Sequence, residues 1–232
     1  MLNISERLAR IAAHVPQGAR MADIGSDHAY LPLYLAQKGQ IASAVAGELN
    51  EGPFRGAERN VRSRGYSDRI TVRKGNGLAV IEPGEVDVIT VAGMGGGTIR
   101  EILSAGEEKL AGVQRLVLSP QGDSEGLRRW LGEHGWQILD EEMLVEDEKM
   151  YEIVVAERGE MAVDDRNAME FGPILLAQKH PLIADRVDYE LGKIRLALEG
   201  LEKAKGDSGE QRRQELLARR QQLEEVKAYV QS

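Results

Sequence analysis

Several short stretches of this chain place acidic residues, an asparagine or glycines where they could bind a ligand. The first is Asp23-Ile24-Gly25-Ser26-Asp27-His28, which has one glycine where a dinucleotide-binding turn has three. Such a turn holds a pyrophosphate at a helix N-terminus, and the Asp27 carboxylate would repel that group. Acids at Asp23 and Asp27 instead suit a ligand with a cationic end, such as a sulfonium amino acid. The alternative is a purely architectural turn in which Asp23 caps the next helix.

Three further stretches with the same character follow along the chain. Glu48 comes 23 residues after Gly25, where a carboxylate accepts both ribose hydroxyls of an adenosine-containing cofactor. Asn76, between Gly75 and Gly77, could accept a hydrogen bond from an adenine amino group or simply form a turn. The run Gly93-Met94-Gly95-Gly96-Gly97 could let a ligand approach the backbone or form a tight turn. It is not a P-loop, because no Lys-Ser/Thr pair follows it.

The elements that must position these stretches alternate between strand and helix. Hydrophobic patterns and turn residues predict five strands, over 20–25, 42–48, 69–73, 86–92 and 115–119. Helices are expected over 3–14, 30–38, 53–64, 98–109 and 125–134, and a closing pair of strands over 137–143 and 151–157. This alternation predicts an α/β fold with a mostly parallel, doubly wound sheet. Such sheets bind ligands beyond the carboxyl ends of their strands.

A different pattern begins near residue 164. Apolar residues then recur at steps of three and four, from Ile183 to Leu201 and again from Leu216 to Val230. Two helices joined by a short turn within 205–211 would form an antiparallel hairpin with a coiled-coil seam. We therefore expect two domains, a Rossmann-like domain over 1–160 and a helical domain over 161–232.

Composition and charge exclude several classes of site. The chain has 232 residues and no cysteine, which excludes a disulfide framework, a thiolate nucleophile and a cysteine zinc site. The histidines lack metal-ligand spacing, so we expect no metal. The residues before 16 are amphipathic and lack the apolar core of a signal peptide, and no apolar run could cross a membrane. These features are consistent with a cytoplasmic protein.

The net charge of −8 predicts no general attraction to nucleic acid, but the charge is unevenly distributed. Residues 55–74 hold seven basic and two acidic side chains. Arg55, Arg59 and Arg62 fall on one face of the predicted helix 53–64. They could contact phosphates, or they could simply form a solvated helix face.

The same stretches resemble a known family. The segments 21–32, 46–48 with 52–54, and 92–96 are similar to those of the bacterial tRNA adenine-N1 methyltransferases that modify the adenine at tRNA position 22. The resemblance covers essentially the whole chain. It implies S-adenosyl-L-methionine as cofactor, tRNA as partner, and a Rossmann-like domain followed by a C-terminal coiled-coil domain. The C-terminal helical hairpin would clamp the tRNA or mediate self-association, and the sequence favours neither role.

The resemblance also assigns roles to individual residues. It implies that Glu48 holds the ribose and that Asp27 is needed for activity. The other residues expected around the cofactor are Asp23, Gly25, Ser26, His28, Asn76, Gly77, Gly93, Met94 and Gly95. Two positions depart from the family pattern: Asn76 replaces an aspartate, and Ser119-Pro120-Gln121 replaces Gln-Pro-Asn. The second departure puts the contacts to the target base at that loop in doubt.

The expected chemistry demands little from the protein besides positioning. Adenine N1 carries a free lone pair at neutral pH, so no strong base is required, and the reacting atoms must be held in line. Because N1 lies on the Watson–Crick edge, the base must be unpaired or flipped out. Tyr30 is a candidate surface on which the base stacks, and Asp27 could accept the adenine amino proton. Asp27 could instead serve as an architectural hydrogen-bond partner in the turn.

Two alternative functions belong to other classes. A nicotinamide-dependent oxidoreductase is disfavoured by Asp27 and by the missing glycines. A catalytically silent RNA-binding adaptor stays possible because of Asn76 and the Ser119-Pro120-Gln121 loop.

Overall fold

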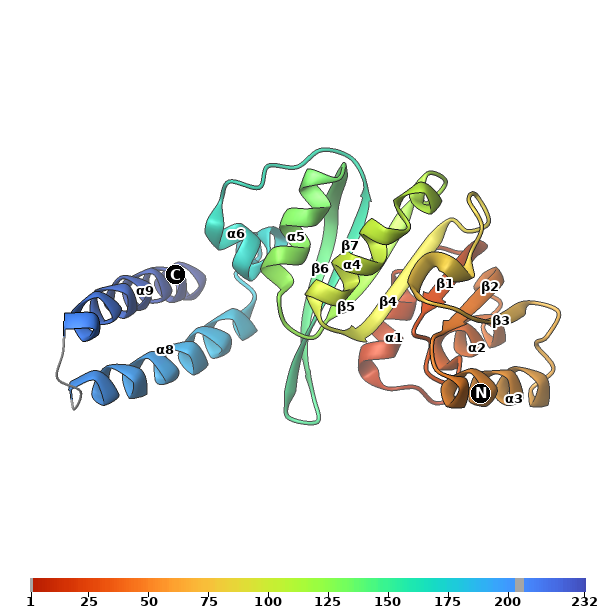
Figure 1. Ribbon diagram of the computed structural model, residues 1–232, viewed down its shortest axis with the longest axis horizontal. Coiled ribbons are helices and arrows are strands. Elements are labelled where there is room, and N and C mark those ends of the chain that lie inside the picture. The colour runs from red at the N-terminus through yellow and green to blue at the C-terminus, as the bar shows by residue number, and fades with distance from the viewer. Residues whose placement is uncertain (1, 203–206) are drawn as a thin grey trace.

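The computed structural model describes residues 2–202 and 207–232. Within them, seven strands form one sheet of order β3-β2-β1-β4-β5-β7-β6 (Figure 1). The five strands β1 to β5 run parallel, and β7 and β6 complete the sheet in antiparallel pairing. The strands are β1 Ala19–Ile24, β2 Ile41–Glu48, β3 Ile70–Lys74, β4 Val88–Met94, β5 Arg115–Pro120, β6 Trp136–Glu146 and β7 Lys149–Arg158. The predicted Rossmann-like α/β fold with a mostly parallel sheet is therefore confirmed.

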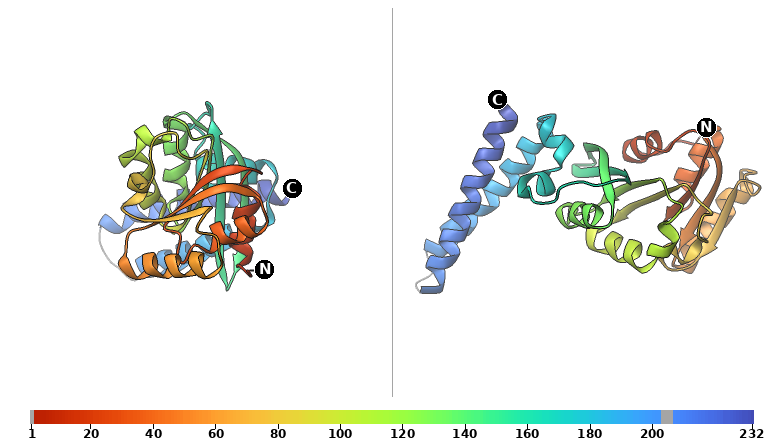
Figure 2. Two further views of the ribbon diagram at one scale, coloured as in Figure 1. Left: turned by 90° about the vertical axis from the view of Figure 1, so that its right-hand side faces the viewer. Right: turned by 90° about the horizontal axis from the view of Figure 1, so that it is seen from above.

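Helices cover both faces of this sheet, as Figure 2 shows from two further sides. One apolar cluster joins the sheet to α1 (Glu6–Ala13), α2 (Tyr30–Gln37) and α3 (Glu51–Ser63). The opposite cluster joins it to α4 (Gly96–Ala105), α5 (Ser124–Glu133) and the short 3-10 helix η1 (Gly77–Val80). Both β2 and β4 end between these layers, which places their carboxyl ends in a position to form a binding site.

Several helix boundaries differ from those predicted: the helix expected over 3–14 begins only at Glu6, and the helices expected over 53–64 and 98–109 are also shifted. The helix expected over 98–109 ends at Ala105, and a separate 3-10 helix, η2 (Glu107–Leu110), follows Gly106. Gly106 lies so close to η1 that a Cβ there would come within 2.6 Å of Leu78 Cβ, which explains the interruption. Helix α3 begins at Glu51 rather than at Pro53. Proline is tolerated there because the first-turn N–H groups have no partner inside the helix.

Four helices follow the sheet: α6 (Arg166–Phe171), α7 (Pro173–Ala177), α8 (Pro181–Glu202) and α9 (Asp207–Gln231). The two long helices α8 and α9 lie side by side at one end of the molecule (Figures 1 and 2). Their periodic residues form a third apolar cluster, which includes Ile183, Val187, Leu223 and Val226 and reaches Met143 on β6. Of the turn predicted within 205–211, residues 205 and 206 lie outside the described residues, and residues 207–211 belong to α9 instead.

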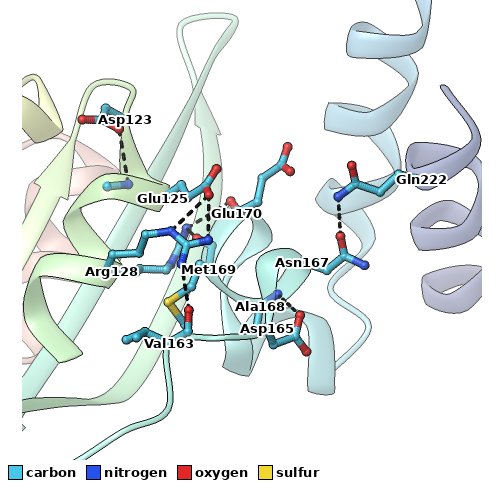
Figure 3. A network of polar contacts seen from close by, with 12 residues as sticks. Asp123, Glu125, Arg128, Val163, Asp165, Asn167, Ala168, Met169, Glu170 and Gln222 are labelled. Carbon is cyan, nitrogen blue, oxygen red and sulfur yellow. Dashed lines mark hydrogen bonds and ion pairs between the residues drawn. The ribbon is translucent and has the colours of Figure 1, made fainter. Parts of the chain in front are cut away.

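Polar contacts connect these helices to the sheet. Arg128 of α5 is fully buried; its guanidinium lies 2.6 Å from Glu141 and 2.5 Å from Glu152, and it donates to the carbonyl oxygens of Met169 and Glu170. In Figure 3, Asn167 accepts a hydrogen bond from Gln222, which joins α6 to α9. The helical region is thus anchored to the β6 edge of the sheet, far from β1 and β2.

Candidate active site

Asp23 lies at the end of β1 and is buried. One carboxylate oxygen accepts a hydrogen bond from Ser26 Oγ and the other from Thr90 Oγ1, each at 2.6 Å. Burial raises the pKa of Asp23, although the two hydroxyl donors oppose that shift. Because both oxygens are engaged inside the fold, Asp23 connects β1 to the following turn and to β4. Asp23 does not cap α2, as the architectural alternative predicted, because no side chain caps the N-terminus of that helix; it holds the turn through these two hydroxyls instead.

The turn after Asp23 adopts an uncommon backbone conformation. Asp27, His28 and Ala29 have φ values of 40°, 67° and 58°, so three consecutive residues with side chains occupy the left-handed region. We call these residues the 27–29 loop. Such conformations persist only where the surroundings enforce them, and they cluster at functional sites. The loop leaves the Asp27 side chain 80% exposed, and Tyr30, at the start of α2, is 37% exposed.

Glu48 lies at the end of β2 and is buried beside the 27–29 loop. Its Oε1 accepts a hydrogen bond of 2.5 Å from the backbone N–H of Asp27. Burial raises the pKa of Glu48, and the negative charges of Asp27 and Asp23 act in the same direction. In the described residues, its second oxygen makes no hydrogen bond. Glu48 is therefore a largely desolvated carboxylate with a free acceptor.

A cavity of about 550 Å³ lies at the carboxyl ends of β1 to β4. This volume is within the range of small-molecule sites. Four of the predicted cofactor residues line it: Gly25, Asn76, Gly77 and Met94. Its remaining walls are mostly apolar and include Ile24, Leu49, Leu78, Ala79, Ile102 and Ala105. We call it the sheet-edge cavity.

Backbone geometry explains the glycines at two points of this site. Gly25 has φ +70°, and a Cβ there would lie 2.2 Å from the terminal methyl of Met94. A Cβ at Gly96 would lie 2.3 Å from the carbonyl oxygen of Asp123, which follows β5. The backbone N–H of Gln121 also donates to the Met94 carbonyl at 2.8 Å. The loops after β1, β4 and β5 therefore lie against one another.

The other predicted cofactor residues lie around the cavity rather than in its described lining. Asp23 and Ser26 are buried behind the turn, and Glu48 lies next to it. His28 turns away from the cavity, and its ring packs against Gly56 of α3. Gly93 is exposed at the end of β4, and Gly95 precedes α4. The site therefore separates into residues that could contact a ligand and residues that hold the turn.

The basic face of α3, formed by Arg55, Arg59 and Arg62, is exposed as expected. The positive charge of residues 55–74 is lower than the sequence count indicates. Glu51 pairs with both Arg55 and Lys74, and Glu85 pairs with Arg73. Within residues 2–202 and 207–232, Arg59 and Arg62 form no ion pair. These two arginines are the members of the face best able to contact an anion.

Some contributors to the site were missed by sequence reasoning. The cavity walls formed by Thr98, Glu101, Ile102 and Ala105 come from one side of α4, and Glu108 and Lys109 come from η2. No motif marks these residues, since their role depends on how α4 packs over the sheet. In the part of the chain that the structure describes, no group of three potential metal ligands is found and no helix could cross a membrane.

Comparison with known proteins shows which family the chain belongs to. A family model described as tRNA (adenine(22)-N(1))-methyltransferase, TrmK, matches residues 21–228. The Bacillus subtilis enzyme of that name is 40% identical over 97% of both chains. The chain belongs to the TrmK family. The predicted family, the predicted class of enzyme and the predicted function are confirmed, and neither alternative function is favoured.

Solved structures of TrmK relatives have the same fold. A Streptococcus pneumoniae protein, described as a candidate tRNA (m1A22) methyltransferase in complex with S-adenosyl-L-methionine, is 43% identical. It has a TM-score of 0.88, and the match covers 97% of this chain and all of that one. The Mycoplasma capricolum TrmK, in complex with S-adenosyl-homocysteine, is 25% identical with a TM-score of 0.85, over 98% and 99% of the two chains. S-adenosyl-L-methionine is thus the cofactor of the TrmK family, as predicted.

Proposed function

We propose that this protein transfers the methyl group of S-adenosyl-L-methionine to N1 of the adenine at tRNA position 22. The observation that carries the proposal is the sheet-edge cavity, which combines an apolar wall for an adenine with the free acceptor of Glu48 beside it. Gly25 and Gly77 line this cavity with positive φ and no side chain, so a ligand could approach their backbone. These features fit the adenosine part of S-adenosyl-L-methionine.

Different residues around the cavity bind different parts of the cofactor. Glu48 accepts hydrogen bonds from the ribose hydroxyls, and the Asn76 side-chain oxygen accepts one from the adenine amino group. Gly25, Gly77, Gly93 and Gly95 let the ligand approach the backbone, and the Met94 side chain, which lies against Gly25, forms part of the apolar wall. Asp23 and Ser26 keep the turn after β1 in place, and His28 braces it against α3. When bound, the cofactor supplies an electrophilic methyl group on a sulfonium centre.

The 27–29 loop and Tyr30, the first residue of α2, supply the residues that act on the target base. The exposed Asp27 carboxylate accepts a hydrogen bond from the adenine amino group and balances the positive charge of the methylated product. The half-exposed Tyr30 ring, next to the His28 ring at a centroid distance of 5.5 Å, offers a surface on which the flipped base stacks. N1 attacks with its own lone pair, so positioning supplies most of the rate enhancement.

The basic face of α3 binds the tRNA backbone in this proposal. Arg59 and Arg62 contribute most, because Glu51 partly neutralises Arg55. Replacing Arg59 and Arg62 by glutamate should weaken tRNA binding and reduce the salt dependence of its affinity. If two phosphate contacts are lost, the slope of log K against log salt changes by about 1.5 to 2. An unchanged slope would exclude this face from the interface.

The remaining expectations concern the helical region. We propose that residues 1–160 form the catalytic domain and that 161–232 form a helical domain, with α8 and α9 as an antiparallel coiled coil. The third apolar cluster supports this division, because it draws most of its members from α6 to α9. The helical domain clamps the tRNA or pairs with a second copy of the chain. A tRNA substrate places the protein in the cytoplasm.

The decisive experiment is nucleoside mass spectrometry. An unmodified tRNA transcript is incubated with the protein and S-adenosyl-L-methionine, and 1-methyladenosine is expected. A transcript with guanine at position 22 should stay unmethylated. The variant Asp27→Ala should bind S-adenosyl-homocysteine normally but turn over slowly. Normal turnover by that variant would remove Asp27 from catalysis, and the absence of 1-methyladenosine with the unaltered protein would reject the proposed function.

A further inference from the structure

The strained 27–29 loop needs support from outside itself. Non-glycine residues rarely adopt positive φ, and here three do so in succession. On one side, the loop is held by the hydrogen bond from the Asp27 N–H to Glu48. Because Glu48 is also expected to bind the ribose, a second support is needed if the loop is to keep its shape during cofactor exchange.

Helix α3 provides that second support. The side-chain amide of Asn60 donates a hydrogen bond of 3.0 Å to the backbone carbonyl of His28. One turn earlier, the His28 ring lies directly on Gly56, where a Cβ would come within 2.6 Å of Nδ1 and 2.9 Å of Cε1. Asn60 thus fixes the backbone of the loop, and Gly56 provides the space for its side chain. Neither residue contacts the sheet-edge cavity in its described lining.

The same helix also carries the exposed Arg59 and Arg62. With 3.6 residues per turn, Gly56 and Asn60 lie on the side of α3 next to its basic face. A tRNA phosphate bound to that face and the loop that carries Asp27 are therefore attached to one rigid element. This arrangement sets the distance between the bound tRNA backbone and the 27–29 loop.

We propose that Asn60 and Gly56 are positioning residues for the methyl-transfer reaction. They hold the 27–29 loop in the conformation in which Asp27 and Tyr30 meet the target adenine, and they connect that loop to the tRNA-binding face of α3. The inference rests on the proposed function. It assigns to α3 a part in turnover that is separate from cofactor binding.

Two substitutions test the proposal in different ways. Asn60→Asp keeps the size of the side chain but removes its N–H donor and turns a carboxylate oxygen toward the His28 carbonyl. Gly56→Ala places a methyl group against the His28 ring, while alanine favours the helix. The matched control is Gly52→Ala on the same helix, because a Cβ at Gly52 would meet nothing within 4 Å.

Both variants should lower kcat by on the order of tenfold while leaving the KM for tRNA and the Kd for S-adenosyl-homocysteine within about threefold. Gly56→Ala should do so with a Tm equal to or above that of the unaltered protein, and Gly52→Ala should keep full activity. Asn60→Gln, which retains the amide donor on a longer side chain, should recover part of the kcat. Equal activity of Gly56→Ala and Gly52→Ala would overturn the proposal, as would a fall in kcat matched by a lower folded fraction.

Amide hydrogen exchange separates this inference from the proposed function. In Asn60→Asp the amides of residues 27–30 should exchange faster, whereas those of β1 should be unchanged. This measurement needs no tRNA and no turnover. If the unaltered protein makes no 1-methyladenosine, the proposed function fails while exchange still reports on Asn60. If exchange in the loop is unaffected by the substitution, the support from Asn60 is disproved whatever the activity.

Discussion

The carboxylates of Asp23 and Glu48 are buried at the carboxyl edge of the sheet, whereas at its β6 edge Glu141 is buried and Glu152 is partly buried. In the described residues, the first pair has no ion-pair partner and interacts with hydroxyls and a backbone N–H. The second pair surrounds Arg128, whose remaining donors reach two carbonyl oxygens.

The difference shows what each region is built to do. An unpaired buried carboxylate is costly, because desolvation disfavours its charged form, and the raised pKa of Glu48 reflects that cost. A carboxylate left with a free acceptor can bind a ligand that brings its own donors. At the β6 edge the acceptors are already occupied, so that region stabilises the fold and offers little to a ligand. Substitutions at the carboxyl edge should therefore change mainly ligand affinity, and substitutions at the β6 edge should change mainly the stability of the fold.

The largest effect is expected at Arg128. Arg128→Met removes the cation and leaves Glu141 buried without its partner, which should lower the free energy of unfolding by about 3 to 5 kcal/mol. Urea denaturation measures this loss. The protein that stays folded should bind S-adenosyl-homocysteine with unaltered affinity. Adding Glu141→Gln should recover part of the stability, and no recovery would show that the carbonyl contacts of Arg128 dominate instead.

Glu48→Gln should produce the opposite pattern. The amide cannot accept from both ribose hydroxyls as a carboxylate does, so affinity for S-adenosyl-homocysteine should fall about 10- to 100-fold. The free energy of unfolding at neutral pH should be equal or slightly higher, because a desolvated charge is removed. Isothermal titration calorimetry and thermal unfolding measure the two quantities. Asp68→Asn, which removes one charge at an exposed site, is the control.

The raised pKa of Glu48 also predicts a pH dependence. The ionised carboxylate binds the ribose, so affinity for S-adenosyl-homocysteine should fall as the pH drops through this raised pKa. Stability behaves oppositely for this group: the folded protein holds the Glu48 proton more tightly than the unfolded chain. Its contribution to the unfolding free energy therefore increases as the pH falls through that window. In Glu48→Gln both dependences should be weaker, and an identical pH profile of affinity in the two proteins would contradict the role of Glu48.

The smallest effect is expected at Asn76. Asn76→Asp supplies a charged acceptor for the adenine amino group, and hydrogen bonds to charged groups exceed neutral ones by roughly 1 kcal/mol. Affinity for S-adenosyl-homocysteine should rise about fivefold. Calorimetry with inosine-containing and adenosine-containing ligands shows whether the gain depends on the amino group. A gain with both ligands would place Asn76 elsewhere in the site.

The features that could be predicted were those that depend on residues close together in the sequence. Strand ends followed by Gly, Asp, Asn or Glu indicated the edge where the sheet-edge cavity lies. The sequence did not show that both carboxylate oxygens of Asp23 are occupied inside the fold, because its partner Thr90 is 67 residues away. The pairing of Glu51 with Lys74 likewise reduced the basic surface in a way that a count along the chain cannot show.

The Arg128 network had no sequence signal at all. An arginine in an amphipathic helix is usually exposed, and its burial depends on β6, β7 and α6 meeting around it. The strain of the 27–29 loop was equally hidden, since none of its three residues is glycine. In both cases distant elements enforce what local preferences disfavour.

The placement of α9 has a consequence for how the chain folds during synthesis. All seven strands and both walls of the sheet-edge cavity precede α9 in the sequence, so the ribosome releases them first. Leu223 and Val226, which complete the apolar cluster around Ile183 and Met143, emerge much later, together with the Arg219 that pairs with Glu170. A nascent chain that stalls before α9 thus displays an uncovered apolar surface at the β6 edge although its cavity is already complete, and it is such chains that chaperones must protect from aggregation.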